Sequence, residues 1–193
     1  MRAGTFIRTF RAKDGRDVTL RAPKWADLDD MLNFINDLVD EGAEITIDRK
    51  MTRDDEIDWL ARKLSRLEKN QIIGIVAEID GEFVGQVEVD PKSGHSKHVG
   101  VLGISITKKY RDIGIGLELI KEAEYQATKL GIEVMTLSAF ATNERAIHVY
   151  TKAGYKEMGR IPNHHHKDGK YIDDVIMAKD ISSRTKLSDD AKR

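Results

Sequence analysis

One segment constrains the possible folds more than any other, because an apolar strand pattern in it leads through a glycine-bearing turn directly into an amphipathic helix. The segment runs from Ile104 to Leu117 with the sequence ISITKKYRDIGIGL. Beyond it, apolar residues recur at helical spacing up to about Leu130. Gly114 and Gly116 can adopt backbone conformations closed to other residues and let a ligand approach the main chain. The segment therefore predicts a strand, a loop with exposed amides and a helix.

The amides at the start of this helix predict an anion site. The backbone N–H groups from Arg111 to Leu117 lie where the helix begins, and the helix dipole there favours negative charge. Pyrophosphate suits such a loop. A Rossmann dinucleotide site is the alternative, but it needs three glycines early in a βαβ unit and an acidic residue ending the next strand. Here the glycines come late and the next predicted strand, Glu133–Ala139, ends without an acid, which argues against this alternative.

Turn and cap residues divide the rest of the chain into further elements. The Asp-Gly pairs at 14–15 and 80–81 each predict a hairpin turn, and Thr52 with Asp55 resembles a helix capping box. The pattern predicts one mixed α/β (α+β) sandwich around a mostly antiparallel sheet, not a doubly wound fold. The other predicted elements are strands at 5–10, 17–21, 71–79, 82–90, 98–106, 155–160 and 170–178 and helices at 25–39, 53–67 and 143–153.

Composition limits the class of protein further. A chain of 193 residues with 40% apolar residues predicts one domain, at 1–180, followed by a polar tail at 181–193. The formal net charge of -1 gives no reason to expect a nucleic-acid or membrane partner. The absence of cysteine excludes disulfides, thiolate metal sites and a cysteine nucleophile, and it fits a reducing cytoplasm. We therefore expect a cytoplasmic, soluble protein.

Two motifs together resemble a known family. The first is R-x-x-G-x-G at 111–116, and the second is N-x-x-A-x-x-x-Y at 143–150, which Gly154 and an aromatic residue follow. Their residues and separation resemble the GCN5-related N-acetyltransferases (GNAT), and the resemblance covers Arg16 to about Lys179. It implies an acyl-CoA N-acyltransferase fold, in which a central sheet flanked by helices splays apart to admit the cofactor, acetyl-CoA.

The resemblance also implies where the cofactor binds. The backbone of Ile104 and Ile106 would bond the pantetheine arm, the amides of 111–116 would hold the pyrophosphate, and Asn143 would reach the cofactor from its helix. The residues expected to bind the cofactor are Ile104, Ser105, Ile106, Arg111, Asp112, Ile113, Gly114, Ile115, Gly116, Leu117, Asn143 and Tyr150.

The same resemblance leads to hypotheses about catalysis. Tyr150, seven residues after Asn143 and so close to two helical turns away, is expected to be the acid that assists the departing thiolate. Relatives often carry a glutamate base at about the position of Val101, which this chain lacks. Glu88 on the preceding strand is our choice of base. The alternatives left open are His98, Asp173, Asp174 and a water chain.

Neither the acceptor nor the oligomeric state follows from the motifs. The expected acceptor is a primary amine, either a small cationic amine such as a polyamine or a protein amino group. An acidic cluster, defined as Asp37, Asp40, Glu41 and Glu44, would attract such a cation. A catalytically inactive acetyl-CoA sensor is the alternative function, and a homodimer is expected only from the resemblance.

The run His164-His165-His166 raises the question of a metal site. Consecutive histidines on a loop cannot easily converge on one ion, and no carboxylate with characteristic spacing accompanies them. We therefore expect a solvated loop and no metal, and we leave open a role in acceptor binding or in a response to pH.

Overall fold

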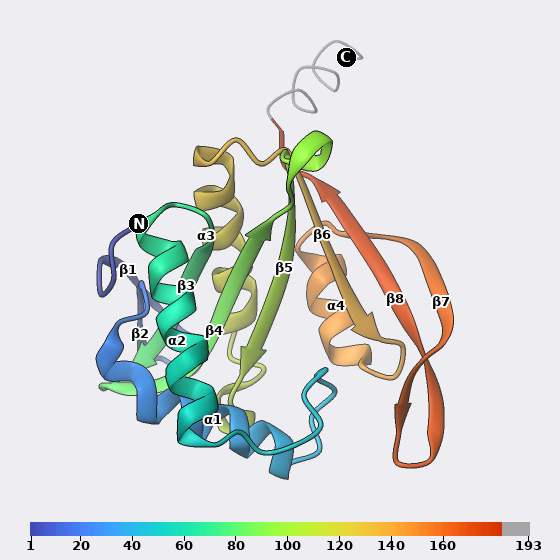
Figure 1. Cartoon of the computed structure of the whole chain (residues 1–193), viewed down its shortest axis with the longest axis horizontal. Coiled ribbons are helices and arrows are strands. Elements are labelled where there is room, and N and C mark those ends of the chain that lie inside the picture. The colour runs from blue at the N-terminus through green and yellow to red at the C-terminus, as the bar shows by residue number, and fades with distance from the viewer. Residues whose placement is uncertain (183–193) are drawn as a thin grey trace. The chain divides into compact units, whose positions relative to one another are not determined.

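The computed structural model describes residues 1–182, and Figure 1 shows the arrangement of its helices and strands. The tail predicted at 181–193 lies, apart from its first two residues, outside the described part. The helices are α1 (Leu28–Asp40), α2 (Arg53–Glu68), α3 (Ile115–Lys129) and α4 (Glu144–Lys152). The strands are β1 (Phe6–Arg11), β2 (Asp17–Arg21), β3 (Ile73–Ile79), β4 (Glu82–Pro91), β5 (Val99–Ile106), β6 (Val134–Phe140), β7 (Lys156–Lys167) and β8 (Lys170–Asp180).

The local signals in the sequence act as expected. Asp80 and Gly81 both have positive φ, 51° and 84°, as a two-residue turn between β3 and β4 requires. The Thr52 hydroxyl accepts a hydrogen bond from the Asp55 amide at 3.2 Å, and the Asp55 carboxylate accepts one from the Thr52 amide at 3.0 Å. This capping box starts α2.

The strands are hydrogen-bonded in the order β1-β2-β3-β4-β5-β6-β8-β7. The pairs β1–β2, β2–β3, β6–β8 and β7–β8 are antiparallel, whereas β5 and β6 run parallel. The sheet is therefore mixed and mostly antiparallel, which confirms the predicted fold class. The described residues form two compact units, one of 1–88 with 103–123 and the other of 89–102 with the residues from 124 onward.

In the first unit, α1 and α2 pack on the sheet. The apolar face of α1 predicted from its spacing is buried against β3 and β4, where the Phe34 and Phe83 rings meet edge to face at 5.0 Å. The residues of this core cluster are Leu28, Met31, Phe34, Leu38, Leu60, Val76 and Phe83.

In the second unit, β8 lies between β6 and β7, and β7 is longer than predicted. The sequence predicts a strand only over 155–160, but β7 continues to Lys167 and forms a long ribbon with β8 (Figure 1). His164, His165 and His166 therefore lie on a strand, and the expectation of a loop is wrong. Pairing with β8 extends β7, and the local sequence of β7 does not predict this extension.

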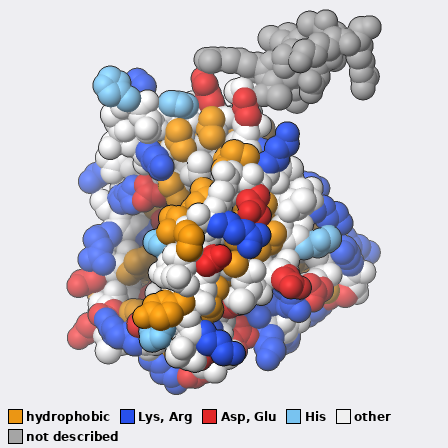
Figure 2. Space-filling view, turned by 90° about the vertical axis from the view of Figure 1, so that its right-hand side faces the viewer, with side chains coloured by type: hydrophobic (Ala, Val, Ile, Leu, Met, Phe, Trp, Pro, Cys, Tyr) orange, Lys and Arg blue, Asp and Glu red, His pale blue; other side chains and the backbone are white. Residues whose placement is uncertain are grey.

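The surface carries apolar as well as charged side chains. Among the helices of the described residues, none is both long and apolar enough to cross a membrane. Figure 2 shows hydrophobic side chains among charged ones on one face. On β7 and β8, Met158, Ile161 and Tyr171 are 59%, 43% and 69% exposed. The homodimer expected from the family resemblance stays a prediction.

Candidate active site

The loop before α3 has the backbone of an anion site. Gly114 has a φ of 96° and Asp112 a φ of 68°, so two residues of the loop lie in the left-handed region. The Glu118 amide donates to the Gly114 carbonyl at 3.3 Å, which makes Gly114 the residue at which the helix begins. The amides of Ile115, Gly116 and Leu117 have no acceptor within the helix. The loop therefore presents N–H groups at the positive end of the α3 dipole.

The turn of the β1–β2 hairpin braces this loop. The Lys13 amide donates to the Ile113 carbonyl at 3.0 Å, and the Lys13 side chain lies along Gly114, where an added Cβ would be 3.7 Å from its Cγ. Sequence reasoning missed this contact, because the two segments are about 100 residues apart and nothing in the hairpin sequence marks it.

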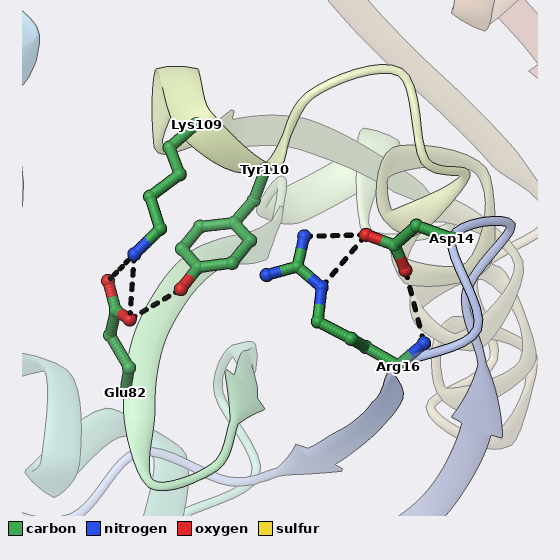
Figure 3. A network of polar contacts seen from close by, with 5 residues as sticks. All are labelled: Asp14, Arg16, Glu82, Lys109 and Tyr110. Atoms are coloured by element: carbon green, nitrogen blue, oxygen red, sulfur yellow. Dashed lines mark hydrogen bonds and ion pairs between the residues drawn. The ribbon is translucent and has the colours of Figure 1, made fainter.

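A charged network holds the residue just before the loop, as Figure 3 shows. The Tyr110 ring is 2% exposed and lies between two cations, with the Arg16 guanidinium 4.8 Å and the Lys109 ammonium 4.7 Å from its centroid. Its hydroxyl donates to Glu82, and this hydrogen bond is the main cause that lowers the pKa of the Glu82 carboxyl. Asp14 in turn binds Arg16 at 2.8 Å. These contacts hold Tyr110 in place at the start of the loop.

The Arg111 side chain has a structural partner. Its Nε donates to the Ile106 carbonyl at 2.9 Å, and its guanidinium forms an ion pair with Glu41, just after α1. Glu41 belongs to the acidic cluster, and Asp40 of that cluster pairs with Lys50 at 2.8 Å. Two of its four carboxylates therefore already face cations, which weakens the hypothesis that the cluster attracts a cationic acceptor.

The strand that leads into the loop has a partly unpaired edge. The parallel ladder of β5 with β6 pairs Val99 to Val101 with Val134 to Thr136 and ends there. Beyond Val101, the β5 backbone has no partner residue in β6 within the described residues, so Ile104 and the Ile106 amide are the groups that a ligand can pair with, whereas the Ile106 carbonyl already accepts from Arg111 Nε. Val101 is 40% exposed at the point where the ladder ends.

Asn143 lies just before α4 and Tyr150 lies on α4, both in the second unit. The Asn143 side-chain oxygen accepts from the Ala146 amide at 3.1 Å, so it caps α4 and leaves the side-chain NH₂ group for another partner. Tyr150 is buried, and burial raises the pKa of its phenol to about 12. The phenol therefore keeps its proton at neutral pH, as a donor must.

Glu88, the expected base, is paired in the structure. Its carboxylate binds the Lys63 ammonium at 2.8 Å, and Lys63 also donates to Gln86 at 2.9 Å and lies 4.3 Å from the centroid of the Trp59 ring. Burial lowers the pKa of Lys63, whose side chain is 4% exposed, while Glu88 opposes that shift. Burial likewise raises the pKa of Glu56 beside them. The Glu88 side chain is 31% exposed, so it retains access to solvent.

A signal for Lys63 exists in the sequence. Leu60, Lys63 and Leu67 fall at helical spacing on the buried face of α2, so a lysine interrupts an apolar stripe. A charged residue in such a stripe indicates a buried partner, and sequence reasoning missed it.

Two of the alternative bases also have structural partners. Asp173 accepts a hydrogen bond from the Asn163 amide at 2.9 Å, and Asp174 lies 3.1 Å from His165 Nε2. Asp174 is 3% exposed and is therefore buried. His98 lies just before β5, and its carbonyl accepts from the Glu133 amide at 2.8 Å.

Known proteins share the fold and the sequence pattern. The model of the acetyltransferase (GNAT) family matches residues 33–155. The L-amino acid N-acetyltransferase AaaT of Escherichia coli is 30% identical over 54% of this chain and 66% of its own length, just under two thirds. The putative phosphinothricin acetyltransferase YwnH of Bacillus subtilis is 22% identical over 86% of this chain and 100% of its own length. The spermidine N(1)-acetyltransferase of Escherichia coli is 30% identical over 53% of this chain and 55% of its own length.

Solved structures of acetyltransferases have the same fold. A GNAT-family acetyltransferase from Streptococcus pneumoniae superposes with a TM-score of 0.75 at 25% identity, covering 84% of this chain and 98% of that one. The putative acetyltransferase yncA of Salmonella typhimurium, solved with acetyl-CoA, superposes with a TM-score of 0.76 at 20% identity, covering 86% and 95%. The chain belongs to the GNAT family of acetyltransferases.

Proposed function

We propose that this chain transfers an acetyl group from acetyl-CoA to a primary amine by direct attack within a ternary complex. The observation that carries the proposal is the loop before α3, where Gly114 and Asp112 with positive φ turn backbone amides outward at a helix N-terminus. Membership of an acetyltransferase family supports acetyl-CoA as the anion that binds at this loop, and the solved structure of yncA contains acetyl-CoA.

The proposal gives the backbone two tasks. The amides of 111–116 bind the pyrophosphate, and the unpaired edge of β5 at Ile104–Ile106 bonds the pantetheine amides as a further strand would. An amide of this edge also donates to the oxyanion that forms when the amine attacks the thioester carbonyl. The NH₂ group of Asn143 donates to the cofactor. None of these tasks requires a metal.

Two side chains move or hold protons. Tyr150, with its raised pKa, donates a hydrogen bond to the thiolate that leaves. Glu88, which is 31% exposed and lies 2.8 Å from the Lys63 ammonium, takes the proton from the acceptor ammonium before the neutral amine attacks. A Glu88→Gln variant should lose most of its rate at neutral pH and recover part of it as pH rises and the amine deprotonates in solution. An unchanged pH–rate profile would remove Glu88 from this role.

The acceptor in this proposal is a small cationic amine, a polyamine or a protein amino group. Names of relatives include an L-amino acid and a spermidine acetyltransferase, which are consistent with a primary amine but do not choose between these classes. We place the enzyme in the cytoplasm, as its lack of cysteine suggests, and expect a homodimer, which sedimentation of the purified chain would test.

A matched pair of variants tests the cofactor site. Gly116 lies in the first turn of α3 without positive φ, so a side chain there imposes no left-handed backbone strain, unlike at Gly114. Gly116→Asp adds a negative charge that favours the helix but repels pyrophosphate, whereas Gly116→Ala adds only a methyl group. Calorimetry with acetyl-CoA should show binding by the parent and by Gly116→Ala, and loss of at least tenfold in affinity for Gly116→Asp.

An amine panel then separates the two functions. An acetyltransferase releases free CoA above background with at least one primary amine. A sensor binds acetyl-CoA but releases none with any amine, and that result would favour the alternative function, for which the valine at position 101 is the supporting feature. No binding of acetyl-CoA by the parent would overturn both.

A further inference from the structure

Three side chains on the β7–β8 ribbon of the second unit lie close together. His164, His165 and Asp174 each offer one ligand atom, and these atoms all lie within 4.8 Å of one another. His165 Nε2 and Asp174 Oδ1 are 3.1 Å apart. Two ligands of a tetrahedral zinc ion are separated by about 3.3 Å when each bond is about 2.0–2.1 Å, so this pair is already close to that spacing.

A β-bulge explains how adjacent histidines reach the same point. Neighbouring side chains on a regular strand point to opposite faces. Here Ile161 pairs with Asp174 and His165 pairs with Ile172, so residues 162–164 of β7 all lie opposite one residue of β8. Asn163 takes a left-handed conformation with a φ of 54° inside this bulge. The bulge removes the alternation and brings His164 to the side of His165, as bulges commonly re-aim a side chain.

The surroundings hold two of the ligands in place. The His165 ring stacks on the Phe140 ring with centroids 3.8 Å apart and planes 8° from parallel, which fixes its rotation. Asp174 is 3% exposed on β8, a strand that is hydrogen-bonded to β6 at Phe140 and to β7 at Ile161. The bulge itself is held by the hydrogen bond from the Asn163 amide to Asp173. A site on such rigid elements keeps its ligands in position.

We propose that His164, His165 and Asp174 bind a divalent transition ion of the zinc type. Two imidazoles and one carboxylate suit zinc, nickel or cobalt rather than magnesium or calcium, which prefer oxygen ligands. Three protein ligands leave one coordination position to water. His164 is exposed, so its side chain is free to close the remaining distance to the ion. The ion ties β7 to β8, and the proposal rests on these three side chains alone and not on the proposed function.

The sequence contains a matched control. His166 is adjacent to the cluster but lies against Tyr171, with ring centroids 4.8 Å apart, and belongs to no group of converging ligands in the described residues. The variants are therefore His164→Ala and Asp174→Asn, which remove a ligand, and His166→Ala, which removes a histidine of the same run. Asp174→Asn keeps the size and a hydrogen bond to His165, so it also separates loss of a ligand from loss of folding.

The experiment uses the full chain without a histidine tag, freed of metal by a chelator. We expect calorimetry with Zn²⁺ to give one site per chain for the parent and for His166→Ala, and affinity reduced at least tenfold for His164→Ala and Asp174→Asn. Co²⁺ should give the strong visible absorption of a four-coordinate ion in the parent, and Zn²⁺ should raise its Tm but not that of His164→Ala. No stoichiometric binding by the parent, or an equal loss in His166→Ala, would overturn the proposal.

Discussion

The burial of Tyr150 predicts a measurable loss of stability at high pH. Its pKa is about 12 in the folded chain, against 10.0 for an ordinary phenol. Below pH 10 the phenol is neutral in both states, so its contribution to stability is fully present. Above pH 10 the unfolded state loses the proton first, and stability falls until pH passes about 12. A shift of about two pH units corresponds to about 2.7 kcal/mol, of which about 1.3 kcal/mol is lost between pH 9 and pH 11.

Urea unfolding of the parent and of Tyr150→Phe, at about pH 9 and about pH 11, measures this contribution. The parent should lose about 1.3 kcal/mol more than Tyr150→Phe over that range, because phenylalanine has no proton to release. The control is Tyr125→Phe, since Tyr125 is 58% exposed and solvent surrounds it in both states. Equal pH dependence in the parent and Tyr150→Phe would refute the burial that gives Tyr150 its proposed role as a donor.

Three substitutions test the packing, each by urea unfolding at neutral pH. Tyr155→Phe should stabilise the chain by about 1 kcal/mol, because its buried hydroxyl makes no hydrogen bond of good geometry within residues 1–182. Gly100→Ala should destabilise it by about 1–3 kcal/mol, because the added Cβ would lie 2.6 Å from Val89 Cγ1; a neutral effect would show that β5 can shift there. Asp27→Ala should cost about 2–3 kcal/mol, because the buried Arg21 guanidinium loses its two hydrogen bonds to Asp27 and keeps the ion pair with Glu78 at 2.8 Å; a cost under 1 kcal/mol would contradict this.

Local patterns in the sequence predicted most of the elements. The turn at 80–81 and the capping box at Thr52 depend on residues within three positions of one another, so the sequence displays them directly. The spacing of the R-x-x-G-x-G motif likewise predicted a loop before α3, because the conformations that Gly114 adopts are intrinsic to glycine.

The side-chain partners could not be predicted in the same way. Arg111 pairs with Glu41, 70 residues earlier, and the ionic partner of Lys63 is 25 residues later, so tertiary packing alone decides both. The length of β7 was missed because pairing with β8 outweighs its weak local propensity. The convergence of His164 on His165 depends on a bulge, for which the run of three histidines contains no signal.

The hydrogen bond from the Lys13 amide to Ile113 affects how the chain can be shortened. The match to the family model begins at residue 33, so a version trimmed to that boundary discards the hairpin turn that supports the loop before α3. Even removal of only residues 1–16 takes away this bond and the Arg16 guanidinium over Tyr110. Limits taken from family alignment are therefore the wrong guide for a minimal version of this protein, and an amino-terminal fusion is safer than an amino-terminal deletion.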